Sequence, residues 1–139
     1  MDIRQFLNDY ADAKGYRFVF GRRAFHNLDD AMDWITAELS STETRETVLF
    51  MDPYTIGTDT DGNKTYRGSF MVLTQNDLDL PDNENYNTNH VPLMLETDKL
   101  VQSMRCTYDF ISDLQSVAMF NELDLNASGF NHTFNLKSS

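Results

Sequence analysis

The sequence predicts an α+β domain in which a mostly antiparallel sheet of about five strands packs against three helices. Apolar residues recur at helical spacing over 2–14, over 27–39 and from 92 to about 115. Short aromatic and β-branched runs separate these segments and are typical of strands. A chain of 139 residues has the usual size of one domain, so we expect residues 1–139 to form a single α+β unit.

The chain begins with a predicted amphipathic helix and a strand. Asp2 stands where an N-cap is expected, and Gly15 is a typical C-terminal stop. Residues 16–20 are aromatic and β-branched, and Gly21 follows them, which predicts a strand. The apolar stripe of the helix consists of Ile3, Phe6, Leu7 and Tyr10.

A second helix and a buried strand come next. Asn27 is an N-cap candidate for a helix whose apolar positions extend to Leu39 and whose first turn is acidic. The run 48–51 is continuously apolar and short, as in a strand covered on both faces. Pro53 cannot donate to a strand ladder, so this strand should end before it.

Residues 52–67 predict a projecting hairpin. Two β-prone segments, 54–56 and 65–67, flank a polar stretch that contains Asp61-Gly62, a dipeptide typical of hairpin turns. The second arm continues through 69–73. The tip carries few apolar residues, which suits a contact with another chain and equally suits a mobile loop.

Residues 76–90 predict an acidic loop. The segment has several Asn, one Pro and no Lys or Arg. His90 falls at its end, without an acid or a nucleophile at a recognisable spacing. Its acidic residues are Asp77, Asp79, Asp82 and Glu84.

The last third predicts the longest helix and a closing hairpin. Pro92 suits the first turn of a helix whose apolar stripe runs to about residue 115. Residues 117–123 then predict a strand, and 126–129 the turn after it. From 130 to 136 the alternation is strict, which places His132 on an apolar strand face as a hydrogen-bonded core histidine.

Charge and composition exclude several classes of protein. Lys and Arg number 11 against 22 Asp and Glu, and the net charge of -11 argues against a sequence-independent grip on phosphates. Five of the 11 basic residues lie in the first 23 positions, so the chain has a basic end and an acidic middle, as in head-to-tail docking or in an ordinary scatter of surface charge. No apolar run approaches the roughly 20 residues of a membrane span, and no signal-peptide core follows Met1, so we expect synthesis in the cytosol. Cys106 is the single cysteine and excludes an internal disulfide.

Motifs for catalysis, cofactors and metals are weak. Asp59-x-Asp61-Gly62 suggests a calcium loop, but with Gly62 in sixth place the first and twelfth positions are Gly57 and Gly68, which offer no carboxylate. A hairpin turn is favoured there. No phosphate loop, Cys-x-x-Cys pair or nucleophile motif occurs, so we expect no enzyme, no cofactor and no metal.

Four segments together resemble small neck and tail-completion proteins of tailed bacteriophages, including tail-terminator and head-to-tail joining subunits. They are GYRFVFG at 15–21, YRGSFMV at 66–72, FNELD at 120–124 and Gly129-Phe130, set in the same succession of helix, hairpin, long helix and closing hairpin. The Asn- and Asp-rich style is similar to that of phages of the crAss-like group. The resemblance covers most of the chain.

This resemblance implies a virion structural protein. Such subunits form rings of identical copies between portal and tail, have no catalytic residues, and leave a conduit through which DNA passes unbound. In such a ring we expect the hairpin to use Tyr54, Ile56, Asp61, Gly62 and Tyr66 as subunit contacts. Our hypothesis from charge is that the acids of the loop 76–90 face the lumen, where carboxylates would disfavour binding to DNA phosphates. Partners would be copies of the chain and the portal, neck or tail proteins above and below, first in the host cytoplasm and then in the virion.

Two other classes remain open. A small acidic binding module, such as a DNA mimic that blocks a basic host protein, would use the same negative charge. A metal-dependent enzyme would use Asp59, Asp61 and a histidine.

Overall fold

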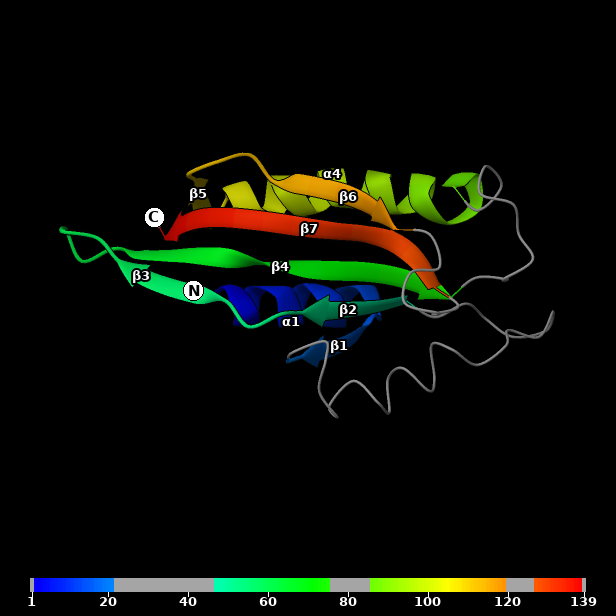
Figure 1. Ribbon diagram of the computed structural model, residues 1–139, viewed down its shortest axis with the longest axis horizontal. Helices are drawn as coiled ribbons and strands as arrows, with labels where there is room; N and C mark the ends of the chain where they lie inside the picture. Colours follow the sequence, from blue (N-terminus) through cyan, green and yellow to red (C-terminus); the bar gives the residue numbers. More distant parts are fainter. Residues whose placement is uncertain (1, 22–46, 76–85, 120–126, 139) are drawn as a thin grey trace.

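The computed structural model confirms the α+β class (Figure 1). Within the described residues, three helical segments accompany one mixed sheet of seven strands, and this number of strands exceeds the predicted five or so. Every strand pair is antiparallel except the first. The predicted helix at 27–39 lies outside the described residues. The structure describes residues 2–21, 47–75, 86–119 and 127–138.

A long two-stranded ladder, β4 with β7, forms the middle of the sheet. It pairs Thr65 with Lys137 at one end and Gln75 with Ala127 at the other. Both β2 and β3 pair with β4 on one side, and both β5 and β6 pair with β7 on the other, while β1 lies parallel to β2. The strands are β1 (Arg17–Phe20), β2 (Thr47–Met51), β3 (Thr55–Thr58), β4 (Lys64–Gln75), β5 (Tyr108–Phe110), β6 (Gln115–Met119) and β7 (Ala127–Ser138).

The sheet has more strands than predicted because two shorter strands, instead of one long strand, pair with each of the two central strands. Pro53 separates β2 from β3, as its missing N–H requires. The Asp52 amide still donates to the Ser69 carbonyl at 3.1 Å, and the Ser69 hydroxyl donates to the Asp52 carboxylate at 2.8 Å. The interruption therefore acts as a bulge within one discontinuous strand.

Helix α1 (Ile3–Lys14) confirms the first predicted helix and its stop. It buries Ile3, Leu7 and Ala11, and Gly15 ends it with φ 73°. Asp2 occupies the N-cap position, but its side chain does not cap the helix. It accepts a hydrogen bond from the Tyr54 hydroxyl instead, at 2.6 Å.

Helix α4 (Val91–Arg105) begins where predicted, with Pro92 in its first turn, but ends ten residues early. The helical spacing of Tyr108, Ile111 and Leu114 was misleading. Tyr108 lies instead on β5, which pairs with the end of β7, and it is buried with its ring 5.6 Å from that of Phe6. Burial of a large aromatic side chain outweighs helix propensity here.

The closing strands match the prediction in pattern and differ in their ends. On β7 the alternation is confirmed, with Phe130, His132, Phe134 and Leu136 buried on one face. The turn predicted at 126–129 is wrong for 127–129, because these residues already pair with β4. Strand β6 starts two residues earlier than predicted, and residues 120–126 lie outside the described part.

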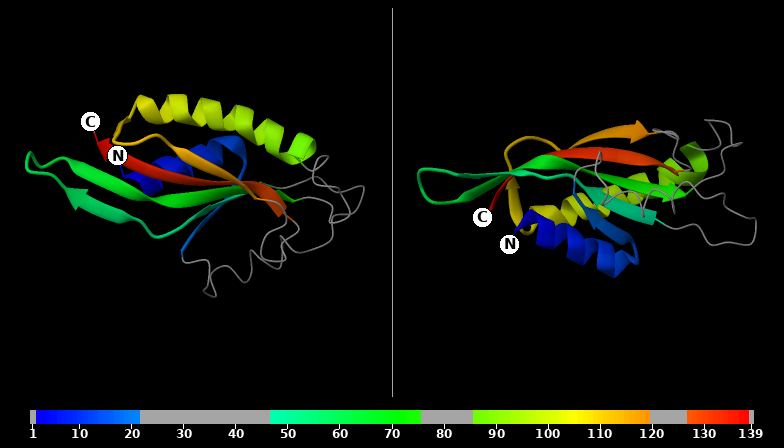
Figure 2. Two further views of the ribbon diagram at one scale, coloured as in Figure 1. Left: turned by 45° about the horizontal axis from the view of Figure 1, so that its top comes forward. Right: turned by 60° about the horizontal axis from the view of Figure 1, so that its bottom comes forward.

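One face of the sheet carries the main core. Both α1 and α4 lie on this face (Figure 2), where Leu93, Leu100 and Met104 of α4 join the apolar residues of α1 and the strands. On the opposite face Val48 and Phe50 of β2 are buried as well. This confirms the prediction that the run 48–51 is covered on both faces.

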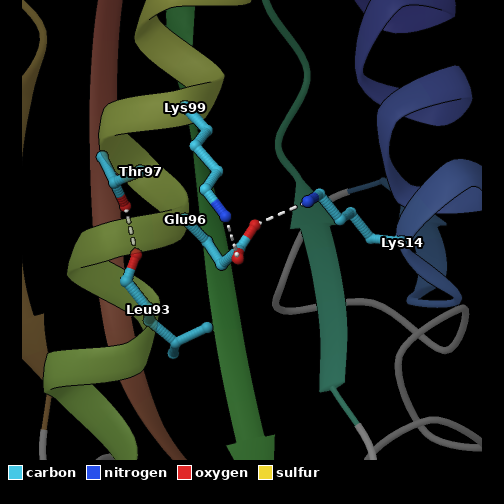
Figure 3. A network of polar contacts seen from close by, with 5 residues as sticks. All are labelled: Lys14, Leu93, Glu96, Thr97 and Lys99. Carbon is cyan, nitrogen blue, oxygen red and sulfur yellow. Dashed lines mark hydrogen bonds and ion pairs between the residues drawn. The ribbon is translucent and has the colours of Figure 1, made fainter.

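An ion pair ties the two helices together. Lys14, at the end of α1, lies 2.7 Å from Glu96 of α4, and Lys99 lies 3.3 Å from the same carboxylate (Figure 3). The hydrogen bond from Lys14 lowers the pKa of Glu96 below its ordinary value. A base of the N-terminal region is therefore engaged within its own subunit.

Candidate interaction surface

The predicted hairpin is present, and we call residues 55–67 the arm. It consists of β3 and the first part of β4, and its tip extends beyond the rest of the described chain (Figure 1). Ile56 is 55% exposed, and Asp61 and Gly62 at the tip are exposed as well. These three predicted contact residues are therefore accessible to another chain.

The two predicted tyrosines lie at the base of the arm and serve the core of the subunit. Tyr66 is 6% exposed, which leaves almost none of its surface for a neighbour. Its ring lies 6.1 Å from that of Tyr54. Burial, together with the hydrogen bond to Asp2, raises the pKa of Tyr54 to about 12. Sequence patterning placed both residues on the hairpin but could not separate its base from its tip.

Asp59 organises the tip. Its carboxylate accepts hydrogen bonds from the amides of Asp61 and Asn63, both at 2.9 Å. The second carboxylate oxygen lies 3.0 Å from the Lys137 amine on β7. These contacts lower the pKa of Asp59, with the hydrogen bond from Lys137 the largest cause. Gly62 has φ 85°, and this positive backbone angle is the reason why Asp61-Gly62 predicts a hairpin turn.

Removing the Asp59 carboxylate should loosen the tip. In Asp59→Ala we expect hydrogen exchange of the Asp61 and Asn63 amides to accelerate at least about tenfold, because both lose their acceptor. Asp61→Ala is the matched control, since it removes an equal charge at the same tip and should leave both amides protected. Nuclear magnetic resonance detects each amide. Equal exchange in the two variants would contradict this role of Asp59.

The predicted acidic lumen residues lie outside the described residues. The role of Asp77, Asp79, Asp82 and Glu84 therefore stays a sequence prediction. At the end of that loop the prediction is wrong, because Tyr86–His90 forms one π-helical turn, η2, before α4.

His90 is part of the structural core and not of a loop. It is fully buried, and its Nε2 donates to the Met119 carbonyl at 2.8 Å. Its ring stacks on that of Tyr86 at 5.4 Å and meets that of Phe130 edge-on at 5.3 Å. Stacking and hydrogen bonding with distant segments stabilise this turn, and no local sequence pattern predicts these contacts.

A pocket of about 300 Å³ lies between α4 and the strands β6 and β7. Within it the Ser116 hydroxyl is 2.7 Å from Nδ1 of His132, and this confirms the predicted hydrogen-bonded core histidine. Burial lowers the pKa of His132 to about 4, so the imidazole is neutral near pH 7 and a weak base. The arrangement fits a structural pair better than an activated nucleophile. The lining residues are Met94, Thr97, Asp98, Ser116, Phe130 and His132.

Neither a cluster of metal ligands nor a membrane-spanning helix occurs in the described part of the chain. Over the four described ranges, no three His, Cys, Asp or Glu side chains gather as metal ligands would. No described helix has the length and apolar character needed to cross a bilayer.

Comparison with family models, with characterised proteins and with solved structures found no match to this chain.

Proposed function

We propose that this protein is a virion structural subunit that assembles with copies of itself into a ring in the neck or upper tail of a tailed bacteriophage. The ring would join portal and head to the tail and leave a conduit for DNA. The arm carries this proposal. It is held by specific hydrogen bonds at its tip, yet β3 leaves Thr55, Ile56 and Thr58 exposed and adds little to the core of its own subunit. An ordered element with this exposure suits a contact with a neighbour.

The charge of the chain supports the conduit. With a net charge of -11, the subunit disfavours binding to phosphates, and DNA must slide through such a ring. At physiological ionic strength the Debye length is about 8 Å, so only acids near the duplex would act on it. Asp77, Asp79, Asp82 and Glu84 are the candidates, and the element order that resembles neck and tail-completion proteins supports the same role.

A charge on the arm should prevent assembly. In Ile56→Asp we expect self-association to weaken at least about tenfold, because a buried carboxylate replaces apolar contact at each interface of the ring. The fold should persist, since Ile56 is 55% exposed in the subunit. Sedimentation velocity over a range of protein concentrations measures the association, and circular dichroism checks the fold.

Leu95→Asp provides the matched control. Leu95 is 61% exposed on α4, so the substitution adds the same charge at a similar exposure away from the arm. It should leave assembly intact. Equal assembly of Ile56→Asp and wild type would contradict the role of the arm. A wild-type monomer that binds a basic host protein in a salt-sensitive way would favour the acidic binding module instead.

A further inference from the structure

Arg67 differs from the other bases that the structure describes. It is exposed on β4 at the base of the arm, and among residues 2–21, 47–75, 86–119 and 127–138 its side chain has no ion pair, hydrogen bond or aromatic partner. Every other base in these ranges has an interaction. These bases are Arg4, Lys14, Arg17, Lys64, Lys99, Arg105 and Lys137.

Arg67 lines an open pocket of about 360 Å³ on the face of the sheet opposite α1 and α4. Strand register explains the pocket, since Thr55, Arg67 and Asn135 form one row across three strands. Gly57 pairs with Thr65 in the next row and has no side chain, and the Thr65 hydroxyl occupies the place that a Cβ atom at Gly57 would take. The lining residues are Thr55, Gly57, Thr65, Arg67, Ile111 and Asn135.

The chemistry of this pocket matches a single carboxylate. A guanidinium offers a planar fork that holds both oxygens of a carboxylate, and two threonine hydroxyls and an amide are further donors beside it. A duplex requires several cations, because its charges lie about 1.7 Å apart along the axis. The nearest base in register, Lys137, is already paired with Asp59 at 3.0 Å.

We propose that Thr55, Thr65, Arg67 and Asn135 form a carboxylate-binding pocket that receives an Asp or Glu side chain from a second copy of this chain. The proposal rests on the ring function, because the ring supplies the occupant. Subunits with 22 acids and 11 bases repel one another, and a cation whose side chain has no partner among the described residues relieves that repulsion where it meets a neighbour's acid. The pocket also lies on the arm, where the contact is expected.

Binding to the pocket is tested on the full chain with sodium acetate as the probe. At constant ionic strength, acetate should shift the Arg67 Nε–H and Asn135 amide resonances saturably, whereas sodium chloride and a short DNA duplex should not. The shifts should vanish in Arg67→Ala. Absence of saturation by acetate, or a stronger response to the duplex, would overturn the carboxylate assignment.

The self-association of Arg67 variants distinguishes the pocket proposal from the proposal that the protein forms a ring. Arg67→Ala should weaken self-association at least about tenfold, and Arg67→Lys should be intermediate because it keeps the charge and loses the fork. Lys99→Ala removes an equal charge from an exposed site on α4 and should assemble normally. If wild type and Arg67→Ala assemble equally, the pocket proposal fails and the ring stands. If wild type does not assemble at any concentration, both fail.

Discussion

Gly129→Ala is expected to unfold the protein or to destabilise it by at least about 3 kcal/mol. Gly129 pairs with Leu73 in the central ladder of β4 and β7. A Cβ atom at this position would fall on the Val72 carbonyl oxygen, 3.0 Å from its carbonyl carbon and 3.1 Å from the Leu73 Cα. The neighbours are backbone atoms of a paired strand, so they cannot move aside as a flexible side chain would.

Gly15→Ala is the control for this prediction. A Cβ at Gly15 has open space within 4 Å, and the strain comes from φ +73° alone. This variant should lose about 1 kcal/mol of unfolding free energy. Urea unfolding followed by circular dichroism measures both proteins. A loss at Gly129 no greater than that at Gly15 would show that the two central strands do not approach as closely as described.

Acid should destabilise the protein through His132. The imidazole is 1% exposed, and its ring lies 4.9 Å from that of Phe70. Burial lowers its pKa from 6.5 to about 4, so the unfolded chain binds the proton more tightly than the folded one. The resulting stability is complete above about pH 6.5 and is lost as the pH falls through 4. The loss should reach about 3 kcal/mol.

His132→Asn isolates this effect. The amide retains a group that can hydrogen-bond Ser116, and it does not titrate. Carboxylates protonate in both proteins over the same pH range, so the difference between their unfolding free energies reports the histidine. We expect that difference to change by about 3 kcal/mol between pH 7 and pH 4 in favour of the variant. Parallel curves for the two proteins would contradict a buried, neutral His132.

Local patterns were sufficient where one segment determines its own structure. The spacing in α1, the continuous run of β2 and the alternation of β7 each record a burial pattern that the structure confirms. The end of α4 could not be predicted in this way. Tyr108 continues the helical period of the sequence, and only its pairing with β7 and its contact with Phe6 make it part of a strand.

The candidate interaction surface was likewise predictable only where one segment determines its own structure. Asp61-Gly62 was sufficient to place the hairpin, because the positive φ of Gly62 is a local property. The role of Asp59 depends on Lys137, which lies far along the chain. The Arg67 pocket needs residues from three strands in register, and the core position of Tyr66 needs Tyr108 beside it at 6.0 Å. Single-segment patterns contain none of this information.

Electron microscopy of the purified protein tests the central claim most directly. We expect class averages of closed rings with an open centre, each built from several copies of the 16.1 kDa subunit, and we expect them to be absent from preparations of Ile56→Asp. Preparations without rings, in which the protein stays an isolated 16.1 kDa subunit at every concentration, would contradict the ring.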